Sequence, residues 1–128
     1  MPIMKMTFEI NEKLPSMNEL IAANRYNRYK GAQMKNDVDA LISYYIIDAK
    51  RRGWVEPITS PCEIYLEWHE RTRKRDVDNI QSSQKFILDA LQKTGILPND
   101  SQKYVQQIYH HVVKDSRDFV RVSIDQGG

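Results

Sequence analysis

The order of the predicted secondary-structure elements indicates an α+β domain, with one small mixed sheet of about four strands covered by two main helices. Three observations lead to this prediction. Apolar and polar residues alternate in two segments, apolar residues recur at helical spacing in two others, and the order of the elements is strand, loop, helix, strand, helix, strand, strand. A chain of 128 residues with 41% apolar content can bury one modest core, so we expect a single domain over residues 1–128.

The first strand is predicted near the N-terminus. There Met4, Met6, Phe8 and Ile10 alternate with polar residues, which is the pattern of a half-buried strand. The segment from Pro15 to about Gln33 shows no clear periodicity, so we predict a loop.

The helix over Met34–Arg52 is the most strongly indicated element. Its apolar residues recur every three or four positions, and Gly53 stands where a helix would stop. These apolar residues are Met34, Val38, Leu41, Ile42, Tyr45, Ile46 and Ala49.

A second strand is predicted around Cys62–Trp68. Cys62 is the only cysteine and has no neighbours at metal-ligand spacing, so it is interpreted as a small buried apolar residue.

A second helix and a hairpin are predicted after Asp78. Four apolar residues can share one helix face, Asp78 or Asn79 suits the N-cap, and Thr94-Gly95 supplies the stop. The four are Ile80, Ile87, Leu88 and Leu91. The last third predicts a hairpin of two strands, Tyr104–Val113 and Phe119–Ile124, joined by residues 114–118. Trp68 and Phe8 are interpreted as core, and the three histidines, His69, His110 and His111, as surface positions.

The basic residues are more informative by their distribution than by the net charge of +2. One cluster, Arg71, Arg73, Lys74 and Arg75, directly follows the second strand, and another set, Arg25, Arg28, Lys30 and Lys35, lies in the predicted loop. Both are plausible phosphate contacts. The run Lys50–Arg52 is better explained as cations at a helix C-terminus. Tyr26 and Tyr29 either stack on unpaired bases or pack within the loop, and the sequence leaves both open.

The chemistry is concentrated where the basic cluster meets the second helix. Asp76 and Asp78 are two apart, so their carboxylates point to the same side of an extended chain. Two hard oxygen donors suit Mg²⁺, which takes one or two carboxylates plus water and substrate phosphate. The segment Leu97–Ser101 is expected to return Asp100 to this place as a third acid.

The Asp-Val-Asp-Asn segment has two other interpretations. Aspartate before a helix is often only a cap. A calcium loop beginning at Asp76 is excluded, because its sixth position is Gln81 rather than glycine and its twelfth is Ile87 rather than glutamate. Four cations beside two close acids favour the nuclease interpretation over the cap, since metal and phosphate need both signs of charge together.

Lys85 also has two interpretations. Asp78, Ser82, Lys85 and Asp89 fall on one polar stripe of the predicted helix, which places Lys85 two turns from Asp78. A lysine there suits a phosphate near the metal. Spacing alone favours an exposed Lys85–Asp89 pair.

Three segments together resemble the RusA-type Holliday junction resolvases. The first is Arg75–Ile80 with Lys85–Leu91, the second is Gly95–Ser101, and the third is Leu14–Asn18, which is similar to the early Pro-Ser-x-Asn motif of the family. A few more residues separate Asn79 from Lys85 than in well-known members, as in a branch from Gram-positive bacteria and their phages. From that spacing we expect a shifted helix start.

The resemblance implies a small α+β homodimer that nicks four-way DNA junctions symmetrically, with Mg²⁺ as cofactor and Mn²⁺ as an alternative. It implies Asp76, Asp78 and Asp100 as metal ligands and Lys85 as a further catalytic residue. The DNA contacts expected with it are Arg71, Arg73, Lys74, Arg75, Asn18 and Arg25.

Two other functions remain open from the sequence. One is a non-catalytic DNA-binding phage accessory protein that uses the acids as caps, and the other is a broader nuclease of flaps or forks. Met1–Lys5 show no signal-peptide pattern and no stretch is long and apolar enough for a membrane span, so we expect a cytoplasmic protein.

Overall fold

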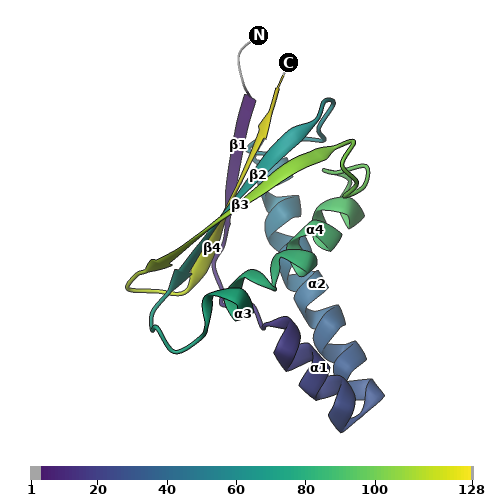
Figure 1. Ribbon diagram of the computed structural model, residues 1–128. Helices are drawn as coiled ribbons and strands as arrows, with labels where there is room; N and C mark the ends of the chain where they lie inside the picture. Colours follow the sequence, from purple (N-terminus) through teal and green to yellow (C-terminus); the bar gives the residue numbers. More distant parts are fainter. Residues whose placement is uncertain (1–3, 128) are drawn as a thin grey trace.

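The computed structural model describes residues 4–127 and contains one four-stranded mixed sheet with helices on one face (Figure 1). The elements are β1 (Met4–Ile10), α1 (Met17–Tyr26), α2 (Arg28–Arg51), β2 (Cys62–Glu70), α3 (Val77–Gln81), α4 (Gln84–Lys93), β3 (Val105–Lys114) and β4 (Phe119–Gln126). The predicted α+β class is confirmed. Residues 1–3 and 128 of the predicted domain, and the predicted inward side chain of Met4, lie outside what the structure describes.

The strand order β1-β4-β2-β3 corrects the predicted C-terminal hairpin. Both strands exist, but β2 lies between them, antiparallel to β4 and parallel to β3. The physical reason is burial. The strands β2 and β4 bury a row of apolar side chains against the helices, whereas β3 exposes four of its first seven residues, which suits an edge strand. The carboxyl ends of β2 and β3 therefore meet at one end of the sheet.

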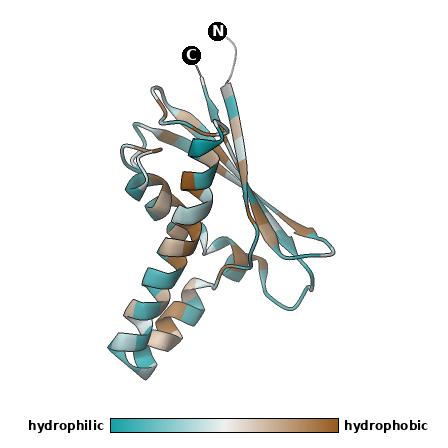
Figure 2. Cartoon of the chain, turned by 180° about the vertical axis from the view of Figure 1, so that it is seen from behind, coloured by the Kyte–Doolittle hydropathy of each residue, from teal (hydrophilic) through white to brown (hydrophobic). Residues whose placement is uncertain are grey.

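The core lies between the sheet and the helices α2 and α4. Cross-strand pairs such as Leu66–Val122 and Trp68–Val120 face this side, and the predicted core residues Trp68 and Phe8 are 2% and 3% exposed. Figure 2 shows the hydrophobic segments on the sheet and on the helix surfaces near it. Among the described helices, none combines the length and apolar character needed to cross a membrane.

The predicted loop over residues 15–33 is instead the helix α1 and the first turns of α2. Ser16 caps α1 by accepting from the Glu19 N–H, and Asn27 caps α2 by accepting from the Lys30 N–H. Periodicity missed these helices because α1 buries only Leu20. The Ser16-x-x-Glu19 pattern of a capping box is the feature of the sequence that could have predicted the start of α1.

The predicted second helix is broken into α3 and α4 at Ser82–Ser83. The Ser82 hydroxyl donates to the Asn79 carbonyl and accepts from the Met17 N–H, and the Ser83 hydroxyl donates to the Pro15 carbonyl. The polar stripe predicted from Asp78 through Asp89 is therefore not continuous. The N-cap is Asp76 rather than Asp78 or Asn79.

Two of the three histidines are not at the surface, contrary to the prediction. His69 is 7% exposed, stacks on Phe119 and contacts the carboxylates of Glu67 and Asp115. His110 is half-buried and accepts the Trp68 indole N–H at Nδ1, so its Nε2 carries the proton and donates to Gln84. Burial lowers the His110 pKa below its usual value, in keeping with this neutral form. Only His111 is exposed.

Candidate active site

Asp76 and Asp78 lie where the loop after the central strand β2 enters α3. Asp76 has extended backbone (φ −68°, ψ 151°) and is the N-cap, whereas Asp78 lies in the first turn of α3, so the extended chain predicted to carry both carboxylates ends at Asp76. Both are exposed, and the Asp76 side chain makes no cap hydrogen bond. Within residues 4–127 neither carboxylate has a side-chain hydrogen bond or an ion pair, so both are available to a ligand.

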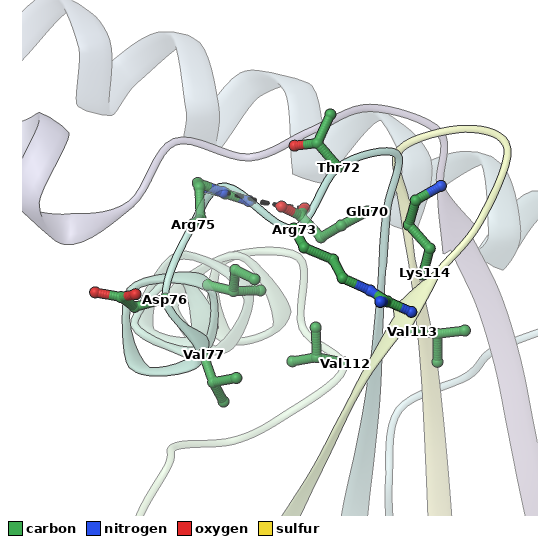
Figure 3. Close-up of a pocket in the computed structure, with 10 residues that line it drawn as sticks. Glu70, Thr72, Arg73, Arg75, Asp76, Val77, Val112, Val113 and Lys114 are labelled. Atoms are coloured by element: carbon green, nitrogen blue, oxygen red, sulfur yellow. Dashed lines mark hydrogen bonds and ion pairs between the residues drawn. The ribbon is translucent and has the colours of Figure 1, made fainter.

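Arg75, next to Asp76, is held by a buried acid. Its Nε and Nη2 donate to Glu70 Oε1 and Oε2 at 3.0 and 2.8 Å, and its Nη1 donates to the Leu14 carbonyl at 3.1 Å. The side chains of Arg75 and Glu70 are 14% and 7% exposed. This bidentate pair fixes the residue before Asp76, and Figure 3 shows the Asp76 carboxylate directed away from the pair.

The early Pro-Ser-x-Asn segment packs against the same place. The Asn18 side chain donates to that of Asn79, the Met17 N–H donates to Ser82, and the Pro15 carbonyl accepts from Ser83. These hydrogen bonds join segments that are more than 60 residues apart in the chain. The Asn18 side chain contacts Asn79 and so helps to position α3.

A cavity of about 400 Å³ adjoins Asp76 (Figure 3). It is lined by the end of β2, the start of α3 and the end of β3, which contributes Lys114. Arg73 also lines it, and neither Arg73 nor Lys114 has an ion-pair partner among the described residues. Sequence reasoning missed Lys114, because only the parallel pairing of β3 with β2 brings its strand end to this place. The cavity therefore offers two unpaired cations beside an exposed acid.

Asp100 lies at the other end of the sheet. It precedes β3, whose first residue Val105 pairs with Cys62 at the start of β2, whereas the cavity beside Asp76 is lined by Val112 and Lys114 at the end of β3. Seven strand residues at about 3.3 Å each separate these positions by about 23 Å. The structure thus places Asp76 and Asp78 at the start of α3 but does not bring Asp100 to them within one chain, contrary to the expectation for the 97–101 loop.

Lys85 is the second residue of α4 and pairs with Asp89 at 3.5 Å, with the lysine side chain 63% exposed. The exposed pair that the sequence favoured is thus observed. The ammonium of Lys85 remains open to solvent on the side away from Asp89, so the pair does not prevent a phosphate contact.

The other predicted DNA contacts lie in two separate places. Arg71 is 66% exposed and contacts Asp118 at 3.4 Å, and Lys74 is exposed without an ion pair in the described chain. Arg25 lies near the end of α1, remote from the 71–75 cluster in Figure 1. The cations therefore do not form a single patch.

The donor chemistry fits a magnesium ion bound by two carboxylates. Across the described part of the chain, no group of three or more His, Cys, Asp or Glu side chains lies close enough to hold a metal. Mg²⁺ does not require one, because it commonly takes one or two carboxylates and completes its shell with water and substrate phosphate. Asp76 and Asp78 supply such oxygen donors.

Exposed acids, unpaired cations and an α+β scaffold together define a protein suited to act on nucleic-acid phosphates. The chain matches the family described as Endodeoxyribonuclease RusA over residues 8–125. It therefore belongs to the RusA endodeoxyribonuclease family, which implies a Holliday-junction-resolving endonuclease. A search of curated proteins found no match.

Proposed function

We propose that this chain resolves four-way DNA junctions by symmetric nicking in a reaction that requires Mg²⁺, with Mn²⁺ as an alternative ion. The observation that carries the proposal is the pair of exposed, unpartnered carboxylates of Asp76 and Asp78, beside a cavity lined by Arg73 and Lys114. Family membership supplies the reaction class.

Each residue then has a distinct role. Asp76 and Asp78 hold the ion, which when bound activates water as a nucleophile and polarises the phosphoryl oxygen. Arg73 and Lys114 bind phosphate oxygens in the cavity, and Lys74 and Arg71 contact flanking phosphates. Arg75, whose guanidinium is occupied by Glu70, positions Asp76. Asn18 holds Asn79 and thereby α3.

A two-fold symmetric dimer would place one site on each of two opposed strands, which matches the symmetry of a four-way junction. The same dimer offers a role for Asp100. Because Asp100 lies at the far end of the sheet from Asp76 in its own chain, it joins a site only if a second copy supplies it.

Replacing Lys85 with methionine tests its role against that of its partner. If Lys85 binds the scissile phosphate, Lys85→Met slows cutting by about 100-fold or more, in the range seen on removing one group that stabilises a transition state. Asp89→Asn is the matched control, because it breaks the same 3.5 Å pair and keeps the lysine. The measurement is the single-turnover rate of junction cutting. Equal, small losses in the two variants would assign Lys85 only to the pair.

The proposal is tested by incubating the protein with an end-labelled four-way junction and Mg²⁺, beside a linear duplex of the same sequence. We expect paired nicks at symmetric positions in the junction, no cutting of the duplex and no cutting with EDTA, because the phosphate chemistry depends on the ion. Restoration of cutting by added Mg²⁺ or Mn²⁺ controls for damage by the chelator.

Other outcomes of this experiment separate the alternatives. Junction binding that is unaffected by EDTA and never followed by cutting would contradict the nuclease proposal and favour a DNA-binding accessory protein. Equal cutting of flaps, forks and junctions would keep the metal site and replace junction resolution by a broader structure-selective nuclease. Action in the cytoplasm stays a prediction from the sequence.

A further inference from the structure

The helices α1 and α2 form a hairpin whose turn projects away from the sheet (Figure 1). Asn27 is the C-cap of α1 and the N-cap of α2, and the seven residues Asn24–Lys30 are all exposed. A Cβ placed on Gly31 would lie 1.6 Å from Asn24 Oδ1 and 3.0 Å from Asn24 Cα, so glycine at residue 31 lets the two helices approach closely with the Asn24 side chain between them. We call residues Asn24–Lys30 the hairpin tip.

The hairpin tip and its flanks are strongly basic. Residues 20–36 contain four cations, Arg25, Arg28, Lys30 and Lys35, and no acidic residue. Removing these four from the 19 basic residues leaves 15 against 17 acidic ones in the rest of the chain. Within residues 4–127 none of the four has an ion-pair partner, whereas Arg51, Arg52, Arg117 and Arg121 all contact carboxylates. This local charge suits a polyanion.

Two tyrosines at the hairpin tip expose most of their surface. Tyr26 ends α1 and is 73% exposed, and Tyr29 is the second residue of α2 and is 77% exposed. Lys30 lies over the Tyr26 ring, with its Nζ 4.4 Å from the ring centre. The tyrosines are therefore not packed into a loop, which was one of the two interpretations open from the sequence. Exposed rings among cations are the combination with which proteins bind unpaired nucleobases and their phosphates.

The hairpin is attached directly to the candidate active site. The first turn of α1 is bonded to α3 through Asn18–Asn79 and through the Met17 N–H to Ser82. From there α1 runs for 10 residues to Tyr26, a length of about 15 Å at 1.5 Å per residue. DNA that extends from Asp76 and Asp78 along α1 would reach the hairpin tip about 15 Å further on.

We propose that the hairpin tip is a base-stacking surface that selects DNA with unpaired nucleotides near the cleavage point, through Tyr26 and Tyr29. The proposal rests on the proposed function, because it gives the site its preference for branched over continuous DNA. Paired bases in a duplex keep their faces covered by neighbouring bases, so the tyrosines gain stacking only where bases are open.

The test compares Tyr26→Ala/Tyr29→Ala with the wild-type chain in EDTA, where binding is measured without cutting. We expect affinity for a single-stranded oligonucleotide and for a four-way junction to fall about 5-fold or more, as for loss of base stacking, and duplex affinity to stay unchanged. A 2-aminopurine placed at the branch point should be quenched by the wild-type chain and not by the variant. Tyr26→Phe/Tyr29→Phe keeps the rings and should bind as the wild type does.

Tyr44→Ala is the matched control. Tyr44 lies on the same helix, is 65% exposed, and is 15 residues from Tyr29, about 22 Å along α2. It should leave binding to every DNA unchanged, and thermal unfolding should show that all variants fold, since exposed side chains contribute little to stability.

The outcomes separate this proposal from the proposed function. Unchanged binding by the double alanine variant, a loss equal on duplex and single strand, or the same loss in Tyr44→Ala would overturn the stacking surface even if junctions are cut. A selective loss of single-strand and junction binding supports it even if the wild-type chain cuts nothing.

Discussion

Asp78→Asn is expected to reduce the rate of junction cutting by at least about 100-fold while junction binding is retained. Groups that only support a metal ligand already cost about 10–100-fold when lost, so removal of a direct ligand should cost more. Asparagine keeps the shape of the side chain and removes the charge that attracts the ion. The measurement is single-turnover cutting of a labelled junction beside a binding assay on the same DNA. Asp76→Asn is expected to behave in the same way.

The control for these variants is Asp118→Asn, which alters an acid near the same end of the sheet that already contacts Arg71. It should leave cutting within a few-fold of the wild-type rate. Cutting by Asp78→Asn at the wild-type rate would show that the carboxylate serves only the first turn of α3.

Mixing two inactive variants extends the same experiment to Asp100. If a second copy supplies Asp100, subunits carrying Asp78→Asn and subunits carrying Asp100→Asn can together form a dimer with one intact site. Such a mixture should nick one strand of the junction but not two. Full activity of Asp100→Asn alone would remove Asp100 from the site.

Glu70→Ala should destabilise the protein by about 3–5 kcal/mol, because it leaves the largely buried Arg75 charge without its bidentate partner and with only the exposed Glu19 carboxylate at 4.0 Å. This is a large share of the about 5–15 kcal/mol by which small proteins are stable. Chemical denaturation gives the free energy of unfolding directly. Where the variant still folds, cutting should also slow, since the pair fixes the residue before Asp76.

Two control variants test the cause of the expected loss of stability. Asp89→Ala breaks the exposed pair with Lys85 and should cost only a few tenths of a kcal/mol. Glu70→Leu/Arg75→Met removes both charges, so it should be more stable than Glu70→Ala. If Glu70→Ala costs no more than Asp89→Ala, the pair does not stabilise the turn into α3.

The predictions that held depend on short-range patterns. The four strands, most of α2 and the apolar face of α4 follow from the spacing of neighbouring side chains. The predicted hairpin of β3 and β4 was wrong, because the pairing of strands is not a short-range property. It depends on how much of each strand is buried in the folded sheet. The helices at residues 17–33 were missed because a projecting hairpin buries too few residues to show a period.

By itself, the sequence determined the α+β class, the local Asp-Val-Asp-Asn motif with its adjacent cations, and a family resemblance that the match over residues 8–125 confirms. Only the tertiary structure decided what surrounds that motif. Glu70 pairs with Arg75, Lys114 lines the cavity from the end of the parallel strand β3, and Asp100 precedes the opposite end of that strand. The reason is that the motif consists of neighbouring residues in the chain. The position of a residue far away in the chain depends instead on the burial and pairing of whole strands.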